Sequence, residues 1–136
     1  MTSQAHEITV TRKIFASPAQ IYAAFTSAQG WCAWCCETAE ADARVGGKYH
    51  IYTDGYNAYG EFTQLEPDKV VALTWDGDRE PPMQVRILLD EQGNATNLTF
   101  TVVVLGSHPD MISFVAFLER IWGHALDNLK DVLETS

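Results

Sequence analysis

The order of helical and strand patterns constrains the fold of this chain more than any other feature of the sequence. Ser17-Pro18-Ala19-Gln20 opens a short helical segment, and apolar residues at three- and four-residue steps predict a long helix from Pro109 to Leu133. Between them, segments of period two follow one another. A long helix after an antiparallel sheet buries its apolar stripe by lying across that sheet. We therefore expect an α+β fold with a cavity between helix and sheet.

Six segments predict the strands of this sheet, because apolar and polar residues alternate in them and turn residues bound them. The first runs from Glu7 to Phe15, with Arg12 interrupting its apolar face. A second short helix or turn is expected from Ser27 to Cys36. The remaining strands are expected at Lys48–Thr53, Asn57–Leu65, Lys69–Trp75, Met83–Leu89 and Thr96–Val104. This spacing predicts an antiparallel meander.

Length, composition and charge narrow the class of protein. With 136 residues, 46% of them hydrophobic, the chain can form one core, and we expect a single domain over residues 1–136. Its formal net charge of −9 disfavours nucleic acids and anionic membrane surfaces. No stretch approaches the ~20 apolar residues of a membrane span, and Met1–Glu7 lacks the pattern of a signal peptide. We expect a cytoplasmic protein.

Five motifs fall in a characteristic order along the chain. They are Ser17–Thr26, Trp34, Val45–Tyr49, Gly60–Trp75 and Trp122–Lys130. This order resembles the START-like helix-grip superfamily (SRPBCC), which includes the birch-pollen-allergen type. Within it, the residue types are similar to the branch of the activator of heat-shock-protein-90 ATPase homologue (AHSA-type) C-terminal domain. Asn94-Ala95-Thr96 departs from the Gly-Thr of that branch, and the cysteines around Trp34 are not part of its pattern.

The resemblance implies a curved antiparallel sheet of about six strands, two short helices after the first strand, and a long C-terminal helix across the concave face. It also implies a central cavity, because the wider superfamily binds apolar or aromatic small molecules there. Some relatives are carriers, some are polyketide cyclases or aromatases, and the name-giving branch is a co-chaperone. The fold alone does not choose among these functions.

We hypothesise that apolar side chains of the sheet and the last helix line a ligand cavity. The alternative for each residue is that it fills the core, since aromatic side chains dominate core burial. The expected lining residues are Trp31, Trp34, Tyr49, Ile51, Phe62, Trp75, Val85, Ile87, Phe100, Val102, Phe114, Phe117, Leu118, Ile121 and Trp122.

The three cysteines, Cys32, Cys35 and Cys36, form one cluster. Cys32-x-x-Cys35 has the spacing of a redox pair or of half a metal site. A thioredoxin-type motif needs a preceding strand in a parallel sheet, and a structural zinc site needs four ligands. The sequence predicts neither, so we expect free thiols, no bound metal and no cofactor, although a redox or metal role stays open.

Three functions remain as hypotheses. The leading one is binding of an apolar or aromatic small molecule, with no catalytic residue assigned. A cavity enzyme of polyketide cyclase or hydrolase type predicts a buried ionisable residue opposite the cavity mouth. A co-chaperone-like module, with a role in stress response, predicts function on the outer surface and a cavity too small to matter. Open strand edges allow a homodimer, and no sequence feature supports a chaperone partner.

Overall fold

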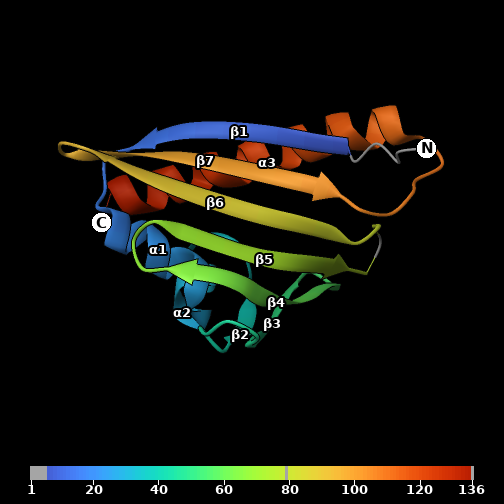
Figure 1. Cartoon of the computed structure of the whole chain (residues 1–136), viewed down its shortest axis with the longest axis horizontal. Helices are drawn as coiled ribbons and strands as arrows, with labels where there is room; N and C mark the ends of the chain where they lie inside the picture. Colours follow the sequence, from blue (N-terminus) through green and yellow to red (C-terminus); the bar gives the residue numbers. More distant parts are fainter. Residues whose placement is uncertain (1–5, 79, 136) are drawn as a thin grey trace.

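The structure is a computed structural model that describes residues 6–78 and 80–135 (Figure 1). Within these residues, seven strands form one antiparallel sheet in the order β1-β7-β6-β5-β4-β3-β2. The expectation about a signal peptide rests mostly on residues 1–5, which lie outside this range. The elements are β1 (His6–Ile14), α1 (Pro18–Thr26), α2 (Ala28–Trp34), β2 (Thr38–Ala41), β3 (Lys48–Thr53), β4 (Tyr56–Glu66), β5 (Val70–Gly77), β6 (Met83–Gln92), β7 (Ala95–Val104) and α3 (Met111–Glu134).

The expected α+β helix-grip fold is confirmed, with one strand more than the sequence predicted. The additional strand is β2, which pairs with β3 through Glu40 opposite His50 and forms an edge of the sheet. Its four residues, Thr38-Ala39-Glu40-Ala41, contain two alanines and a glutamate, which are weak strand formers. Pairing with β3, and not local preference, therefore makes this segment a strand.

The two short helices share one capping residue. Ser17 and Gln20 form the expected capping box at the start of α1. Ser27 ends α1 and also begins α2, where its hydroxyl accepts a hydrogen bond from the Gly30 amide at 2.9 Å. A single non-helical residue between the helices fixes the angle between them, so α1 and α2 behave as one unit.

The long helix α3 begins two residues later than predicted. Asp110 was expected in its first turn, but it is the N-cap and accepts a hydrogen bond from the Ser113 amide at 3.2 Å. An aspartate is among the best N-cap residues because its carboxylate satisfies a free amide of the first turn. Pro109 therefore precedes the helix.

Arg12 explains why the apolar face of β1 is interrupted. Its guanidinium reaches α3, where Nε donates to Asp127 Oδ1 at 2.6 Å and Nη2 donates to the Gly123 carbonyl at 3.1 Å. At Gly123 a side chain would crowd the arginine, since an added Cβ would lie 3.3 Å from Nη2. This polar contact fixes the position of α3 along β1.

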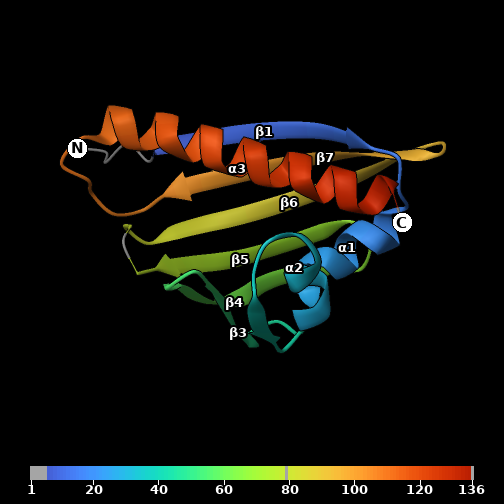
Figure 2. The same ribbon diagram turned by 180° about the vertical axis from the view of Figure 1, so that it is seen from behind.

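The helices cover the concave face unevenly (Figure 2). Helix α3 packs mainly against β1 and, towards its C-terminal end, against α2. The helices α1 and α2 lie beside the C-terminal part of α3 and contact β5, β6 and β2. The part of α3 that follows its N-terminus therefore faces the curled strands β3 to β6 without α1 or α2 in between.

Strand alternation is confirmed on the central strands. On β6, Met83, Val85 and Ile87 are buried, whereas Gln84 and Arg86 are exposed on the convex face. On β3, Tyr49 and Ile51 are buried, and His50 lies on the opposite face, where its ring stacks on Tyr59 with 4.4 Å between centroids. No helix of the described residues is long and apolar enough to cross a membrane.

We predict that the buried Thr96 hydroxyl stabilises the junction between β1 and α1. Thr96 is 0% exposed, and its Oγ1 donates to the Ala16 carbonyl at 2.8 Å. Thr96→Val keeps the shape of the side chain but leaves this carbonyl unpaired, which should lower the free energy of unfolding by about 1–3 kcal/mol. Urea denaturation measures the change, and Thr99→Val, half-buried on the same strand, is the matched control. Equal effects of the two substitutions would contradict the prediction.

Candidate functional site

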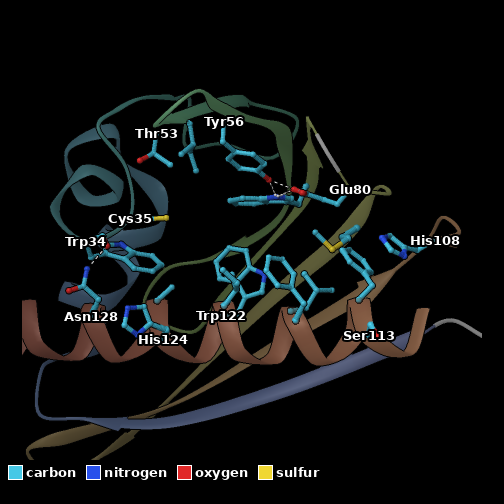
Figure 3. A pocket seen from close by; sticks show the side chains of 18 residues that line it. Trp34, Cys35, Thr53, Tyr56, Glu80, His108, Ser113, Trp122, His124 and Asn128 are labelled. Atoms are coloured by element: carbon cyan, nitrogen blue, oxygen red, sulfur yellow. Dashed lines mark hydrogen bonds between the residues drawn. The ribbon is translucent and has the colours of Figure 1, made fainter. Parts of the chain in front are cut away.

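A cavity of about 860 Å³ lies between α3 and the concave face of the sheet. It is lined by α3, by the end of α2, by strands β3 to β6, and by Glu80 and His108, which lie in the loops before β6 and α3 (Figure 3). These loops are joined by a hydrogen bond from the Leu105 amide to the Pro82 carbonyl at 2.9 Å. The cavity arises because α3 is held against β1, so that the curled strands β3 to β5 have no helix backbone directly above them.

The helix side of the cavity is an apolar row with the helical period. Phe114, Leu118 and Trp122 are buried, while Phe117 and Ile121 are 42% and 46% exposed. The three buried residues therefore form the wall, and the two exposed residues form a rim that opens to solvent. This opening gives a small molecule a route into the cavity.

The sheet side of the cavity is formed around Trp75. Its ring meets Trp122 edge to face, with 5.0 Å between centroids and 81° between planes. Edge-to-face contact holds both rings in one orientation. The pair therefore forms a rigid aromatic wall in the middle of the cavity.

Trp34 closes the cavity at the C-terminal end of α3. Its indole Nε1 donates to the Ala24 carbonyl at 3.1 Å, and Asn128 Nδ2 donates to the Trp34 carbonyl at 2.6 Å. These two bonds tie α2 to α1 and to α3. Trp34 is thus fixed in place whether or not the cavity is occupied.

A polar cluster of Tyr56, Trp75 and Glu80 lies on the sheet side of the cavity (Figure 3). The Tyr56 hydroxyl donates to Glu80 Oε1, and Trp75 Nε1 donates to the Tyr56 oxygen at 2.9 Å and to Glu80 Oε1 at 3.3 Å. Burial, assisted by the hydrogen bond to Glu80, raises the pKa of Tyr56 well above its usual value. Its phenol therefore stays protonated and remains a donor.

Two histidines also line the cavity, at different positions along α3 and the loop before it. His108 stacks on Phe114 with 4.6 Å between ring centroids, and its Nδ1 accepts a hydrogen bond from the Asp110 amide at 3.0 Å. In this orientation a neutral His108 carries its proton on Nε2. His124 lies on α3, thirteen residues after the first residue of the helix, Met111. Among the described residues, neither histidine is hydrogen-bonded to Glu80, whose carboxylate accepts from Tyr56 and Trp75 instead.

The cysteine cluster contributes one residue to the cavity. Cys35 lines it, and the Cys32 and Cys36 sulfurs lie 3.4 Å apart as free thiols. Burial raises the pKa of the Cys35 thiol to about 12, and Cys32 adds to the shift. Within residues 6–78 and 80–135, no group of three or more metal-ligating side chains comes together.

Eight of the fifteen residues expected in the lining do line this cavity. They are Trp34, Ile51, Trp75, Phe114, Phe117, Leu118, Ile121 and Trp122. The other seven are buried in the core beneath it: Trp31, Tyr49, Phe62, Val85, Ile87, Phe100 and Val102. Phe25 of α1 contacts two of them, with its ring centroid 5.4 Å from that of Trp31 and 6.4 Å from that of Phe100, and Trp122 of α3 also contacts Phe100, at 4.7 Å.

Ten lining residues were not expected: Cys35, Thr53, Tyr56, Glu80, Met83, His108, Ser113, His124, Ala125 and Asn128. Met83 continues the alternation of Val85 and Ile87, and Ala125 and Asn128 continue the helical period of Ile121. The periodicity of the sequence could therefore have predicted these three residues. Glu80 and His108 lie in loops, where no periodicity indicates direction.

Comparison with known proteins relates most of the chain to one family. The family described as "Activator of Hsp90 ATPase homolog 1-like protein" matches residues 15–134. The mouse protein named "Activator of 90 kDa heat shock protein ATPase homolog 1" is 38% identical over 69 residues, which are 51% of this chain and 20% of the mouse protein. The chain thus matches only about a fifth of that relative.

Solved structures share the fold along nearly the whole chain. The Aha1 dimer from Colwellia psychrerythraea has a TM-score of 0.81 at 28% identity, with 95% of this chain and 96% of that chain covered. CalU16 from Micromonospora echinospora has a TM-score of 0.79 at 21% identity over 95% of this chain and 76% of that chain. An HSP90 activator from Plasmodium falciparum has a TM-score of 0.70 at 21% identity, covering 90% and 89%.

We predict that Cys35 reacts slowly with alkylating agents at neutral pH. The thiolate is the reactive form, so with a pKa of about 12 its fraction rises about tenfold per pH unit throughout the range from 7 to 9.5. Iodoacetamide labelling followed by peptide mass spectrometry measures this rate. The labelling rate of glutathione in the same reaction should level off at pH values above its ordinary thiol pKa. A plateau for Cys35 below pH 9.5 would contradict the raised pKa.

Proposed function

This chain belongs to the Activator of Hsp90 ATPase homolog 1-like family, and we propose that it binds an apolar or aromatic small molecule in the cavity between α3 and the sheet. Binding requires no covalent chemistry in this proposal. A protein that acts only through its outer surface would need no cavity of this size.

The observation that carries the proposal is the size and chemistry of the cavity. Its volume of about 860 Å³ falls within the ~300–1,000 Å³ of small-molecule sites. The walls are formed by Trp34, Trp75, Phe114, Leu118 and Trp122, and the polar groups are few. Such walls favour a flat, apolar ligand that slides between aromatic rings.

Burial of apolar surface would supply most of the affinity. A ligand that removes about 300 Å² of apolar surface from water gains roughly 7 kcal/mol at ~25 cal/mol per Å². Loss of translational freedom subtracts from this value. Micromolar or weaker affinity is therefore expected unless polar contacts add to it.

The acidic net charge of −9 supports a partner other than nucleic acid or an anionic membrane. We propose that the protein acts in the cytoplasm.

Native mass spectrometry of freshly purified protein tests the proposal. With an aromatic compound library added at about 100 μM, above the dissociation constant expected, a non-covalent adduct of a few hundred daltons that disappears on denaturation is the expected result. The adduct can then be identified. A protein that is free of adduct and binds no member of an aromatic compound library would contradict the proposal.

We predict that a charge at the cavity rim weakens this binding. Ile121 lines the cavity at 46% exposure, whereas Ile112 on the same helix is 86% exposed and lies outside the lining. Ile121→Lys should lower ligand affinity about fivefold, because roughly 1 kcal/mol of apolar contact is lost. Ile112→Lys is the matched control and should leave affinity unchanged. Equal losses in both variants would place the ligand outside this cavity.

A second candidate function is co-chaperone activity, favoured by the 38% identity to the mouse ATPase activator. We infer that, in this case, the chain would contact an HSP90-type chaperone through its outer surface, alone or as a homodimer. The ATPase rate of purified HSP90 with and without the chain tests the activity, and sedimentation analysis tests the dimer. If the HSP90 ATPase rate does not change at a saturating concentration of this protein, the co-chaperone candidate is excluded.

A further inference from the structure

Glu80 has one carboxylate oxygen that the fold occupies and one that it leaves open. Oε1 accepts hydrogen bonds from the Tyr56 hydroxyl and from Trp75 Nε1. Within residues 6–78 and 80–135, no hydrogen bond or ion pair reaches Oε2. Because Glu80 lines the cavity, a molecule inside the cavity is in a position to use this second oxygen.

The backbone of β5 is shaped around this cluster. A Cβ at Gly77 would overlap the Glu80 carboxylate and the Tyr56 hydroxyl. Only glycine therefore lets both side chains lie across the end of β5. This close approach orients the Glu80 carboxylate before any ligand arrives, which lowers the ordering cost of binding.

The charge of the lining is one-sided. Glu80 is a carboxylate, and none of the described lining residues is lysine or arginine. Glu80 is half-buried beside apolar walls, where a carboxylate is screened less than on an open surface, so it disfavours a ligand anion and favours a hydrogen-bond donor or a cation. A fatty acid or an aromatic carboxylate is therefore a poor fit, although its apolar part suits the walls.

We propose that the ligand of this cavity is an aromatic molecule bearing an amine or hydroxyl group, and that Glu80 Oε2 accepts a hydrogen bond from that group. This inference rests on the proposed function, since it specifies the occupant of the same cavity. Glu80 acts as the specificity-determining residue. Tyr56 and Trp75 are positioning residues, because they act by holding its other oxygen.

Three pyrene probes that differ in one group test the inference: 1-pyrenemethylamine, 1-pyrenemethanol and 1-pyrenecarboxylic acid. Trp34, Trp75 and Trp122 line the cavity, so energy transfer from tryptophan to pyrene reports binding. At 0.15 M salt, we expect the amine to bind the unmodified protein at least about tenfold more tightly than the carboxylate, with the alcohol between them.

Substitutions then locate the origin of the preference. In Glu80→Gln the ratio of amine to carboxylate affinity should fall below about threefold. Glu91→Gln removes the same charge from an exposed position at the end of β6 and should keep the full ratio. Tyr56→Phe should lower the ratio in part, because it removes one of the two groups that hold Glu80 Oε1. If circular dichroism shows that Glu80→Gln does not fold, Gly77→Ala, which displaces the carboxylate, should lower the ratio instead.

The outcomes separate the inference from the function on which it rests. Binding of all three probes with equal affinity to the unmodified protein would overturn the role of Glu80 and leave the cavity as a ligand site. A tenfold preference that persists in Glu80→Gln would also overturn it. Binding of none of the probes would remove the proposed function, and the inference with it.

Discussion

The contact between Arg12 on β1 and α3 determines where the long helix lies, and the rest of the site depends on that position. A guanidinium that bonds both Asp127 and the Gly123 carbonyl cannot shift along the helix without losing one partner. Helix α3 is therefore held over one edge of the sheet. The opposite strands curl towards it and leave a space that only side chains, or a ligand, can fill.

The aromatic residues divide between this space and the core according to what lies above them. Towards the end of the sheet near α1 and α2, the rings of Phe25 and Trp31 pack in the core with 5.4 Å between centroids. Where α3 faces the sheet alone, Trp75 and Trp122 meet across the cavity. Aromatic residues thus contribute both to the stability of the core and to the walls of the cavity. Which of the two a given residue does depends on the length and position of the helices above it.

The architecture was predictable from the sequence because it depends on periodic patterns. Strand alternation and helical spacing, together with the Ser17 capping box, identified six of the seven strands and the helices α1 and α3. The segment Ser27–Cys36, which contains α2, was expected only as a short helix or turn, and β2 lacked a pattern of its own. The cavity was harder to predict. Alternation assigns Val85 and Phe100 to the concave face, but it does not say whether a helix covers them. The polar cluster involves Glu80, a loop residue whose direction depends on its contact with Tyr56, 24 residues earlier in the chain.

The sheet order has a consequence for how the protein is made. Every strand from β2 to β7 pairs with its neighbour in sequence, but β1 pairs with β7, with Ile8 opposite Val102. During synthesis, the N-terminal strand therefore emerges from the ribosome long before its partner exists. Loop closure over this distance slows folding. Until β1 pairs with β7, the surface against which α3 packs is not formed. The nascent chain then exposes β1 as an unpaired amphipathic strand, which a chaperone or another chain can bind.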